Sequence, residues 1–277
     1  MPPASRRAHK SDPPGARETA SMWRALRIGF LLLVLIAVAT QAWIDRFSTT
    51  RWRHTVFVGA FPVSADGSPV TADYLAQLDQ SRIDEVGEFV KREAGRYGVG
   101  IDEPIELHLY PTLTSPPPAL DPDAGVLTRI VWSLRLRYYR HRMVAAAFPR
   151  PQIAMFLLYH DPALASSLPH SAGLQRGLTA VVHLFASRSQ EAQNRIVMAH
   201  ELLHTFGATD KYDLASGLPK YPDGFADPQL LPLYPQQLAE IMAVKTPLSA
   251  TEARMPDSLE DERVGPVTAK EIGWVRH

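Results

Sequence analysis

The sequence contains no cysteine, which excludes disulfide bonds and thiolate metal ligands anywhere in its 277 residues. A chain without cross-links depends on its hydrophobic core for stability. Its content of 45% hydrophobic and 21% charged residues is typical of a globular protein. The lack of cysteine is compatible with a periplasmic or other extracytoplasmic location. No internal repeat is evident, so repeat architectures are not expected.

The sequence also has no excess of either charge, because 29 Lys and Arg residues balance 29 Asp and Glu residues. The charge is unevenly placed: residues 1–27 hold six basic residues against two acidic ones, a net charge of +4. The rest of the chain therefore carries a net charge of −4. No basic patch in the main part of the chain indicates a nucleic-acid partner, and we expect none.

A long run without charge follows the basic N-terminal segment, from position 28 to position 44. As a helix it would be about 26 Å long, close to the hydrocarbon thickness of a bilayer. Arg24 and Arg27 precede the run, and Trp23 and Trp43 suit the two membrane interfaces. The run predicts one N-terminal transmembrane helix, a signal anchor. Basic residues before it predict a cytoplasmic N-terminus and an extracytoplasmic main domain.

This interpretation divides the chain into a cytoplasmic basic tail (1–27), the anchor (28–44), a juxtamembrane linker (45–54) and a globular domain (55–277). The alternative is a cleaved signal peptide, because Ala37-Val38-Ala39 has the small-x-small form of a cleavage site. In that case the protein is secreted.

Hydrophobic patterns in the globular domain alternate between helical and strand periods and predict an α/β (α+β) fold. Strands are expected near 55–58, 105–110, 153–159 and 177–185, and helices over 71–97 and 126–143. A capping box at 268–271 predicts a short final helix. The 126–143 helix carries five arginines, which form a solvated face or lie on an anionic membrane surface.

A further helix is expected after position 187. Ser187 to Gln190 has the form of a capping box, and residues 190–206 contain no proline or glycine. Apolar residues recur on one face at three- and four-residue spacing. They are Ile196, Ala199, Leu203 and Phe206.

This helix carries a metal-binding motif. His200 and His204 lie four residues apart, so both rings face one side of a helix and can bind one Zn²⁺. Glu201 is placed to act as general base on zinc-bound water. Gly207 can turn the chain out of the helix and bring Asp210 back as a third ligand. The fourth position remains open, as in catalytic rather than structural zinc sites.

The motif, HExxHxxGxxD over residues 200–210, resembles that of the metzincin zinc metallopeptidases, with Asp210 in place of the usual third histidine, as in snapalysin-type enzymes. The resemblance covers about residues 178–245. It implies a zincin domain with a small twisted mixed sheet, an active-site helix and a methionine turn around Met242. The implied activity is zinc-dependent endopeptidase cleavage of a peptide or protein substrate. The strand before the helix (178–183) is expected to border the cleft and pair with extended substrate.

Some assignments have alternatives. Glu240 could replace Asp210 as the third ligand, as in gluzincin-like sites. Tyr212 and Tyr221 are both candidates for an extra oxyanion donor. A function of another class is also open: a membrane-tethered, catalytically inactive protein that binds zinc and peptides.

Overall fold

The computed structural model describes residues 51–121, 124–165, 167–175 and 177–275, with scattered helical positions between 23 and 40. The chain divides into two units, residues 1–44 and 45–277. Most of the predicted anchor 28–44 and all of the cleavage site 37–39 lie outside the described residues. Among the residues that are described, no helix combines the length and apolar character needed to cross a bilayer.

A five-stranded mixed sheet forms the centre of the 45–277 unit, in the order β2-β1-β3-β5-β4. Its strands are β1 (Val56–Ser64), β2 (Ile105–Leu109), β3 (Ile153–His160), β4 (Ala172–Leu174) and β5 (Thr179–Phe185). All neighbours pair in parallel except β4, which pairs antiparallel with β5 at one edge. The sheet confirms the predicted α/β class and the four predicted strands. The edge strand β4 was not predicted.

The strand expected to pair with substrate is therefore an interior strand. β5 pairs with β3 along its whole length, and the first half of its other edge, Thr179–Val181, pairs with β4. The edge position belongs to β4. The prediction was wrong for Thr179–Val181, where β4 occupies the edge, because the three residues of β4 are too few to give a recognisable alternation in the sequence.

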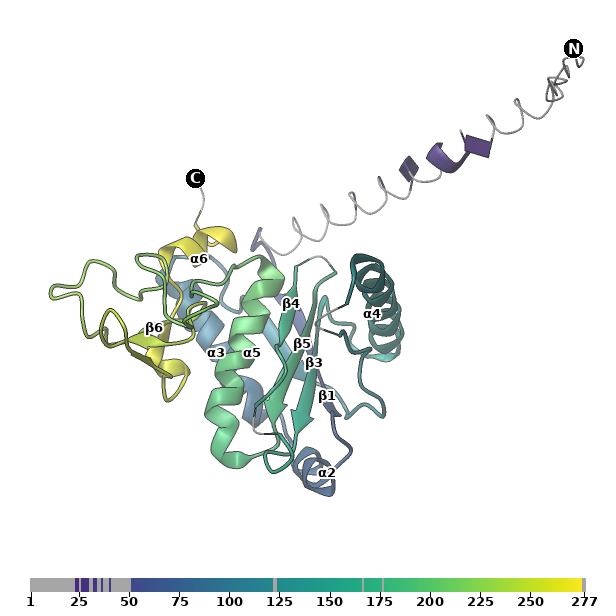
Figure 1. Cartoon of the computed structure of the whole chain (residues 1–277), viewed down its shortest axis with the longest axis horizontal. Helices are drawn as coiled ribbons and strands as arrows, with labels where there is room; N and C mark the ends of the chain where they lie inside the picture. The colour runs from purple at the N-terminus through teal and green to yellow at the C-terminus, as the bar shows by residue number, and fades with distance from the viewer. Residues whose placement is uncertain are drawn as a thin grey trace, which may run out of the picture. The chain divides into compact units, whose positions relative to one another are not determined.

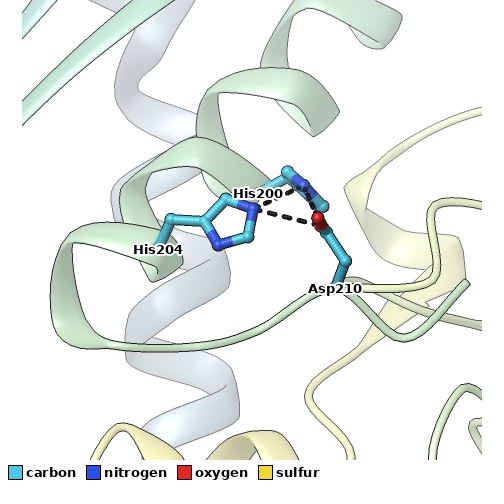
Figure 2. Close-up of side chains that lie close together, drawn as sticks. All are labelled: His200, His204 and Asp210. Atoms are coloured by element: carbon cyan, nitrogen blue, oxygen red, sulfur yellow. Dashed lines mark hydrogen bonds and ion pairs between the residues drawn. The ribbon is translucent and has the colours of Figure 1, made fainter. Parts of the chain in front are cut away.

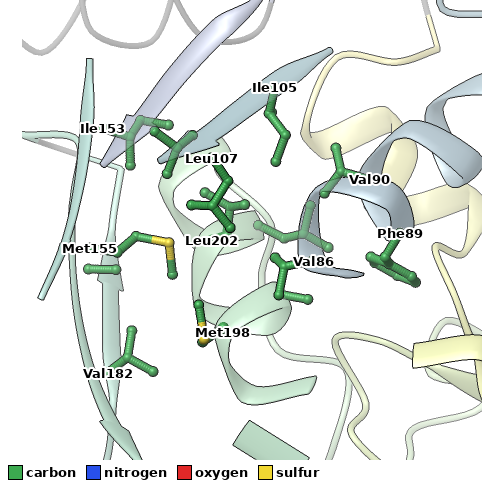
Figure 3. Close-up of a cluster of buried hydrophobic side chains, with 14 of the residues drawn as sticks. Val86, Phe89, Val90, Ile105, Leu107, Ile153, Met155, Val182, Met198 and Leu202 are labelled. Atoms are coloured by element: carbon green, nitrogen blue, oxygen red, sulfur yellow. The ribbon is translucent and has the colours of Figure 1, made fainter. Parts of the chain in front are cut away.

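One face of the sheet is covered by α3 (Ser81–Arg96) and α5 (Glu191–Phe206) (Figure 1). The main hydrophobic core lies between these helices and the sheet. Met155 and Val182 from the strands meet Met198 and Leu202 from α5 (Figure 3). Because burial of such side chains contributes roughly 1.5–3 kcal/mol each, this layer fixes α5 firmly against the sheet.

The opposite face of the sheet is covered by α4 (Val126–Ala146) (Figure 1). Successive side chains of a strand point to opposite faces. Accordingly, Phe156 of β3 belongs to a second, smaller core, together with Phe61 of β1. Tyr139 and Met143 of α4 pack against that core. The sheet is thus buried on both faces, which explains the nearly uninterrupted apolar sequence of β1 and β3.

The helix expected over 71–97 is two helices. α2 (Pro69–Ala76) is capped by Ser68, whose hydroxyl accepts a hydrogen bond from the Thr71 amide, and α3 begins at Ser81. Between them, Asp79 accepts hydrogen bonds from the amide and the hydroxyl of Ser81. Such local side-chain bonds compete with helix hydrogen bonds. The break is therefore caused by polar residues that the apolar periodicity did not reveal.

Short elements make up the C-terminal part of the unit. They are β6 (Ala239–Glu240), β7 (Thr246–Pro247), β8 (Ala253–Arg254), η2 (Leu259–Asp261), β9 (Glu262–Arg263) and α6 (Pro266–Glu271). The final helix starts at Pro266, so the predicted capping box at 268–271 does not form. Thr268 lies inside the helix, and its hydroxyl donates to Glu240 over 2.6 Å. Trp274 packs against Trp52.

Candidate metal centre

Helix α5 starts differently from the prediction. Ser187 makes no capping bond to the backbone, and its hydroxyl bonds that of Ser189 instead. A single turn of 3-10 helix, η1 (Arg188–Gln190), precedes α5. The start of α5 is held by Asn194, whose side-chain amide accepts from the Phe185 amide and donates to the Phe185 carbonyl. Helix α5 is thereby attached to the end of β5.

The end of α5 is the predicted one. Gly207 has φ of +105°, in the left-handed region where glycine is favoured, and its amide donates to the His204 carbonyl. A Cβ at this position would also lie 2.5 Å from the side-chain nitrogen of Gln175. Gly207 therefore meets both a conformational and a steric requirement. The turn directs the chain back toward the helix face that carries the histidines.

The turn brings Asp210 beside His200 and His204 (Figure 2). The two Nε2 atoms are 3.0 Å apart. Asp210 Oδ1 lies 3.3 Å from Nε2 of His200 and 3.1 Å from Nε2 of His204. Among the described residues, this is the group of His, Asp and Glu side chains with the geometry to hold a metal ion. The sequence predicted these three residues as ligands.

Backbone carbonyls orient both imidazole rings. Nδ1 of His200 lies 3.0 Å from the Ile241 carbonyl, and Nδ1 of His204 lies 2.8 Å from the Ala208 carbonyl. A carbonyl can only accept, so each ring carries a proton on Nδ1. The Nε2 lone pairs then face the shared centre, in the tautomer that metal-binding histidines use.

The electrostatics of the group favour positive charge at its centre. When the two imidazole rings are protonated, Nε2–H groups of His200 and His204 donate to Asp210 and hold the pKa of that carboxyl group well below its usual range. Burial opposes protonation of His204, but its hydrogen bond to Asp210 and the nearby Glu201 charge outweigh burial and raise its pKa. A proton or a metal cation would be stabilised between these side chains for the same reason.

Glu201 lies next to this group, with its side chain buried. Burial raises its pKa, although the two histidines and a hydrogen bond from the Gly173 backbone oppose the shift. One carboxylate oxygen, Oε2, is buried and has no hydrogen-bond partner among the described residues. A buried acceptor without a partner is uncommon, and it leaves Oε2 available to another molecule.

Glu240 does not join the metal-binding group. Its fully buried carboxylate accepts hydrogen bonds from the Met242 amide (2.7 Å), the Gly265 amide (3.1 Å) and the Thr268 hydroxyl (2.6 Å). These bonds assign Glu240 a structural position, and they favour Asp210 over the gluzincin-like alternative.

Met242 lies in a tight turn directly after Glu240. The Glu240 carbonyl accepts from the amides three and four residues later, at Ala243 and Val244, and the Met242 side chain is fully buried. The carbonyl that orients His200 belongs to Ile241 in the same turn. The turn thus supports one of the histidines, in the place where the sequence predicted a methionine turn.

The two candidate tyrosines differ. Burial raises the pKa of Tyr212, and the charges of Asp210 and Glu201 add to the shift. Tyr221 is 60% exposed, packs edge-on against Phe225, and its hydroxyl contacts the Pro228 carbonyl. We therefore prefer Tyr212 as the candidate donor, and the role of Tyr221 stays a prediction.

Two supports of the site were not predicted. Gly173 of β4 lies against α5 so closely that a Cβ would be 2.3 Å from the Glu201 carbonyl oxygen and 2.5 Å from His204 Cβ. Glu271 of α6 accepts hydrogen bonds from the amide and hydroxyl of Thr209, next to Asp210. Both residues are distant in sequence from the motif, and only folding brings them to it.

The sequence matches no known family model, and no curated protein matches it.

Proposed function

We propose that this protein is a zinc-dependent metalloendopeptidase of metzincin-like character. One observation carries the proposal: the donor atoms of His200, His204 and Asp210 lie within 3.3 Å of one another beside the Glu201 carboxylate. The same four residues define the motif in the sequence.

The spacing of the donor atoms fits Zn²⁺. Zinc binds imidazole nitrogen and carboxylate oxygen at about 2.0–2.2 Å, so the ligands of a tetrahedral site are about 3.3–3.5 Å apart. The observed separations are 3.0, 3.1 and 3.3 Å. Three protein ligands of this kind leave a fourth position for water or substrate. When bound there, Zn²⁺ would supply Lewis acidity, which polarises a carbonyl and stabilises developing negative charge.

Glu201 is the proposed general base. Its carboxylate would accept a proton from the attacking water and pass it to the leaving amine. Burial raises its pKa, which brings its basicity closer to that needed near neutral pH. The Gly173 amide holds one side of the carboxylate, and Oε2 stays available for the water. Tyr212 could donate a hydrogen bond to the developing oxyanion.

Peptide substrates suit the edge of the sheet. β4 uses one side for pairing with β5, and its Gly173 lies against the catalytic helix. An extended peptide could add to the other side of β4 by main-chain hydrogen bonds. We extend the proposal to location: residues 28–44 anchor the protein in a membrane, with its N-terminus cytoplasmic and its catalytic domain outside the cytoplasm.

The test is hydrolysis of fluorescently labelled casein by the purified full-length protein. We expect the protein to hydrolyse casein, 1,10-phenanthroline to abolish this hydrolysis, and added Zn²⁺ to restore it. In Glu201→Gln, turnover should fall by at least about 100-fold, the scale of general-base catalysis, while zinc remains bound. An exposed control, Glu252→Gln, should retain activity. Zinc binding without turnover in the unmodified protein would favour the inactive binding protein. Retained turnover in Glu201→Gln would exclude Glu201 as the base.

A further inference from the structure

Helix α4 exposes an apolar stripe to solvent. Large apolar side chains stand 47–79% exposed along it. They are Val126, Leu127, Ile130, Val131, Leu134 and Tyr138. At 100° per residue these positions fall on one side of the helix. Leu136, which is buried, lies on the opposite side, toward the sheet. The fold therefore does not need the stripe, because α4 already packs against the sheet through its other face.

Arginines lie beside and within this stripe. By the same helical geometry, Arg135 and Arg142 lie along one border and Arg137 lies within the stripe near its other border, and all three are exposed. Between positions 124 and 160 the sequence contains six arginines and no aspartate or glutamate. The surface therefore joins an apolar strip to a purely positive border.

We propose that α4 docks onto an anionic phospholipid surface, with the apolar stripe in the interface and the arginines at the headgroups. An exposed apolar stripe with arginines beside it can lie in the plane of a membrane, and each basic residue is attracted to anionic lipid. Phe148, directly after the helix and 93% exposed, extends the apolar surface. Figure 1 shows α4 as the outermost layer on its side of the sheet. The arrangement leaves the metal-binding helix α5 on the other face of the sheet.

The arginines argue against a symmetric dimer through α4. Two copies joined in this way would bring arginines against arginines, because residues 124–160 contain no aspartate or glutamate. Anionic headgroups offer both the apolar layer and the compensating charge. The proposal does not depend on zinc or on peptidase activity.

The chain's lack of cysteine provides a direct test. Leu127→Cys in the full-length protein introduces a single labelling site for an environment-sensitive fluorophore on α4. Leu214→Cys, 81% exposed in the segment after Asp210, is the matched control. Each labelled protein is reconstituted into nanodiscs of phosphatidylcholine alone or of phosphatidylcholine with phosphatidylglycerol. Lipids that carry a doxyl quencher report contact with the bilayer.

We expect a blue shift and lipid-dependent quenching of the Leu127 label in anionic discs, and neither change for the Leu214 label. Arg135→Gln, Arg137→Gln and Arg142→Gln together should abolish most of this quenching. The charge-matched control Lys220→Gln, Arg254→Gln and Lys270→Gln should preserve it. Equal quenching of both labels, or equal quenching in neutral discs, would overturn the proposal. A blue shift that appears without lipid and grows with protein concentration would show that the stripe binds a second copy of the chain. This result would also overturn the proposal.

Discussion

Lys211 and Glu271 form an ion pair of 2.7 Å that joins the Asp210 loop to the C-terminal helix α6. The Lys211 ammonium group is almost completely buried and also donates to the carbonyl and the hydroxyl of Thr209. The Lys211 amide donates to the Met242 carbonyl. The residue after the proposed aspartate ligand thus ties that ligand to two distant parts of the chain.

This ion pair predicts a role for Glu271 in metal affinity. Glu271→Gln should weaken zinc binding by about 10-fold or more, because residues that hold metal ligands in place typically contribute 10–100-fold. Competition with a fluorescent zinc chelator measures the effect. Glu260→Gln, an exposed glutamate, serves as control. Unchanged affinity in Glu271→Gln would show that the loop holds Asp210 without α6.

The close contact between Gly173 and α5 gives a second prediction. Gly173→Ala places a methyl group against backbone and Cβ atoms that cannot move independently of the helix. It should lower the free energy of unfolding by about 1–3 kcal/mol, as overpacking does, and displace the amide that bonds Glu201. Chemical denaturation and casein turnover measure the two effects.

The control for this substitution is Gly100→Ala, where no atom lies within 4 Å of the added Cβ and φ does not require glycine. Gly100→Ala should leave unfolding and turnover unchanged. If Gly173→Ala also keeps full turnover, β4 has no part in placing Glu201.

The metal-binding motif could be predicted from the sequence because its residues lie within eleven consecutive positions, 200–210. Helix spacing alone brings His200 and His204 together, and Gly207 shows where the chain turns to deliver Asp210. These predictions agree with the structure. In contrast, Ser187 and Thr268 matched capping boxes that do not form, because the Ser187 hydroxyl bonds that of Ser189 and the Thr268 hydroxyl donates to Glu240. A pattern in the local sequence does not reveal such hydrogen bonds.

The residues that hold the candidate metal ligands in place could not be predicted from local sequence. Gly173, Lys211 and Glu271 act through contacts between segments far apart in the sequence. Glu240 looked like a possible ligand because it is acidic and follows the motif. Its actual partners, including Thr268, become apparent only once α6 is placed.

The buried Glu262 carboxylate should make the free energy of unfolding depend on pH. Its carboxylate is fully buried, and neither oxygen has a hydrogen-bond partner among the described residues. Burial, followed by the charges of Glu240, Asp261 and Glu93, raises its pKa well above the ordinary value of 4.5. The folded state therefore binds the proton more tightly than the unfolded state, so stability falls as pH rises above that value.

Glu262→Gln removes this titration. The variant should match the unmodified protein in acid and exceed its stability at neutral and alkaline pH, as measured by urea unfolding across a pH series. Glu252→Gln, an exposed glutamate, should follow the unmodified protein throughout. If Glu262→Gln showed the same pH dependence as the unmodified protein, the carboxyl group would have to be ionised or solvated in the folded state.

Metal analysis of the purified full-length protein tests the central assignment most directly. After loading with Zn²⁺ and removal of excess metal, the unmodified protein should contain one zinc per chain, and His204→Ala should contain almost none. Absence of zinc from the unmodified protein, or a full equivalent retained by His204→Ala, would contradict the assignment of His200, His204 and Asp210 as its ligands.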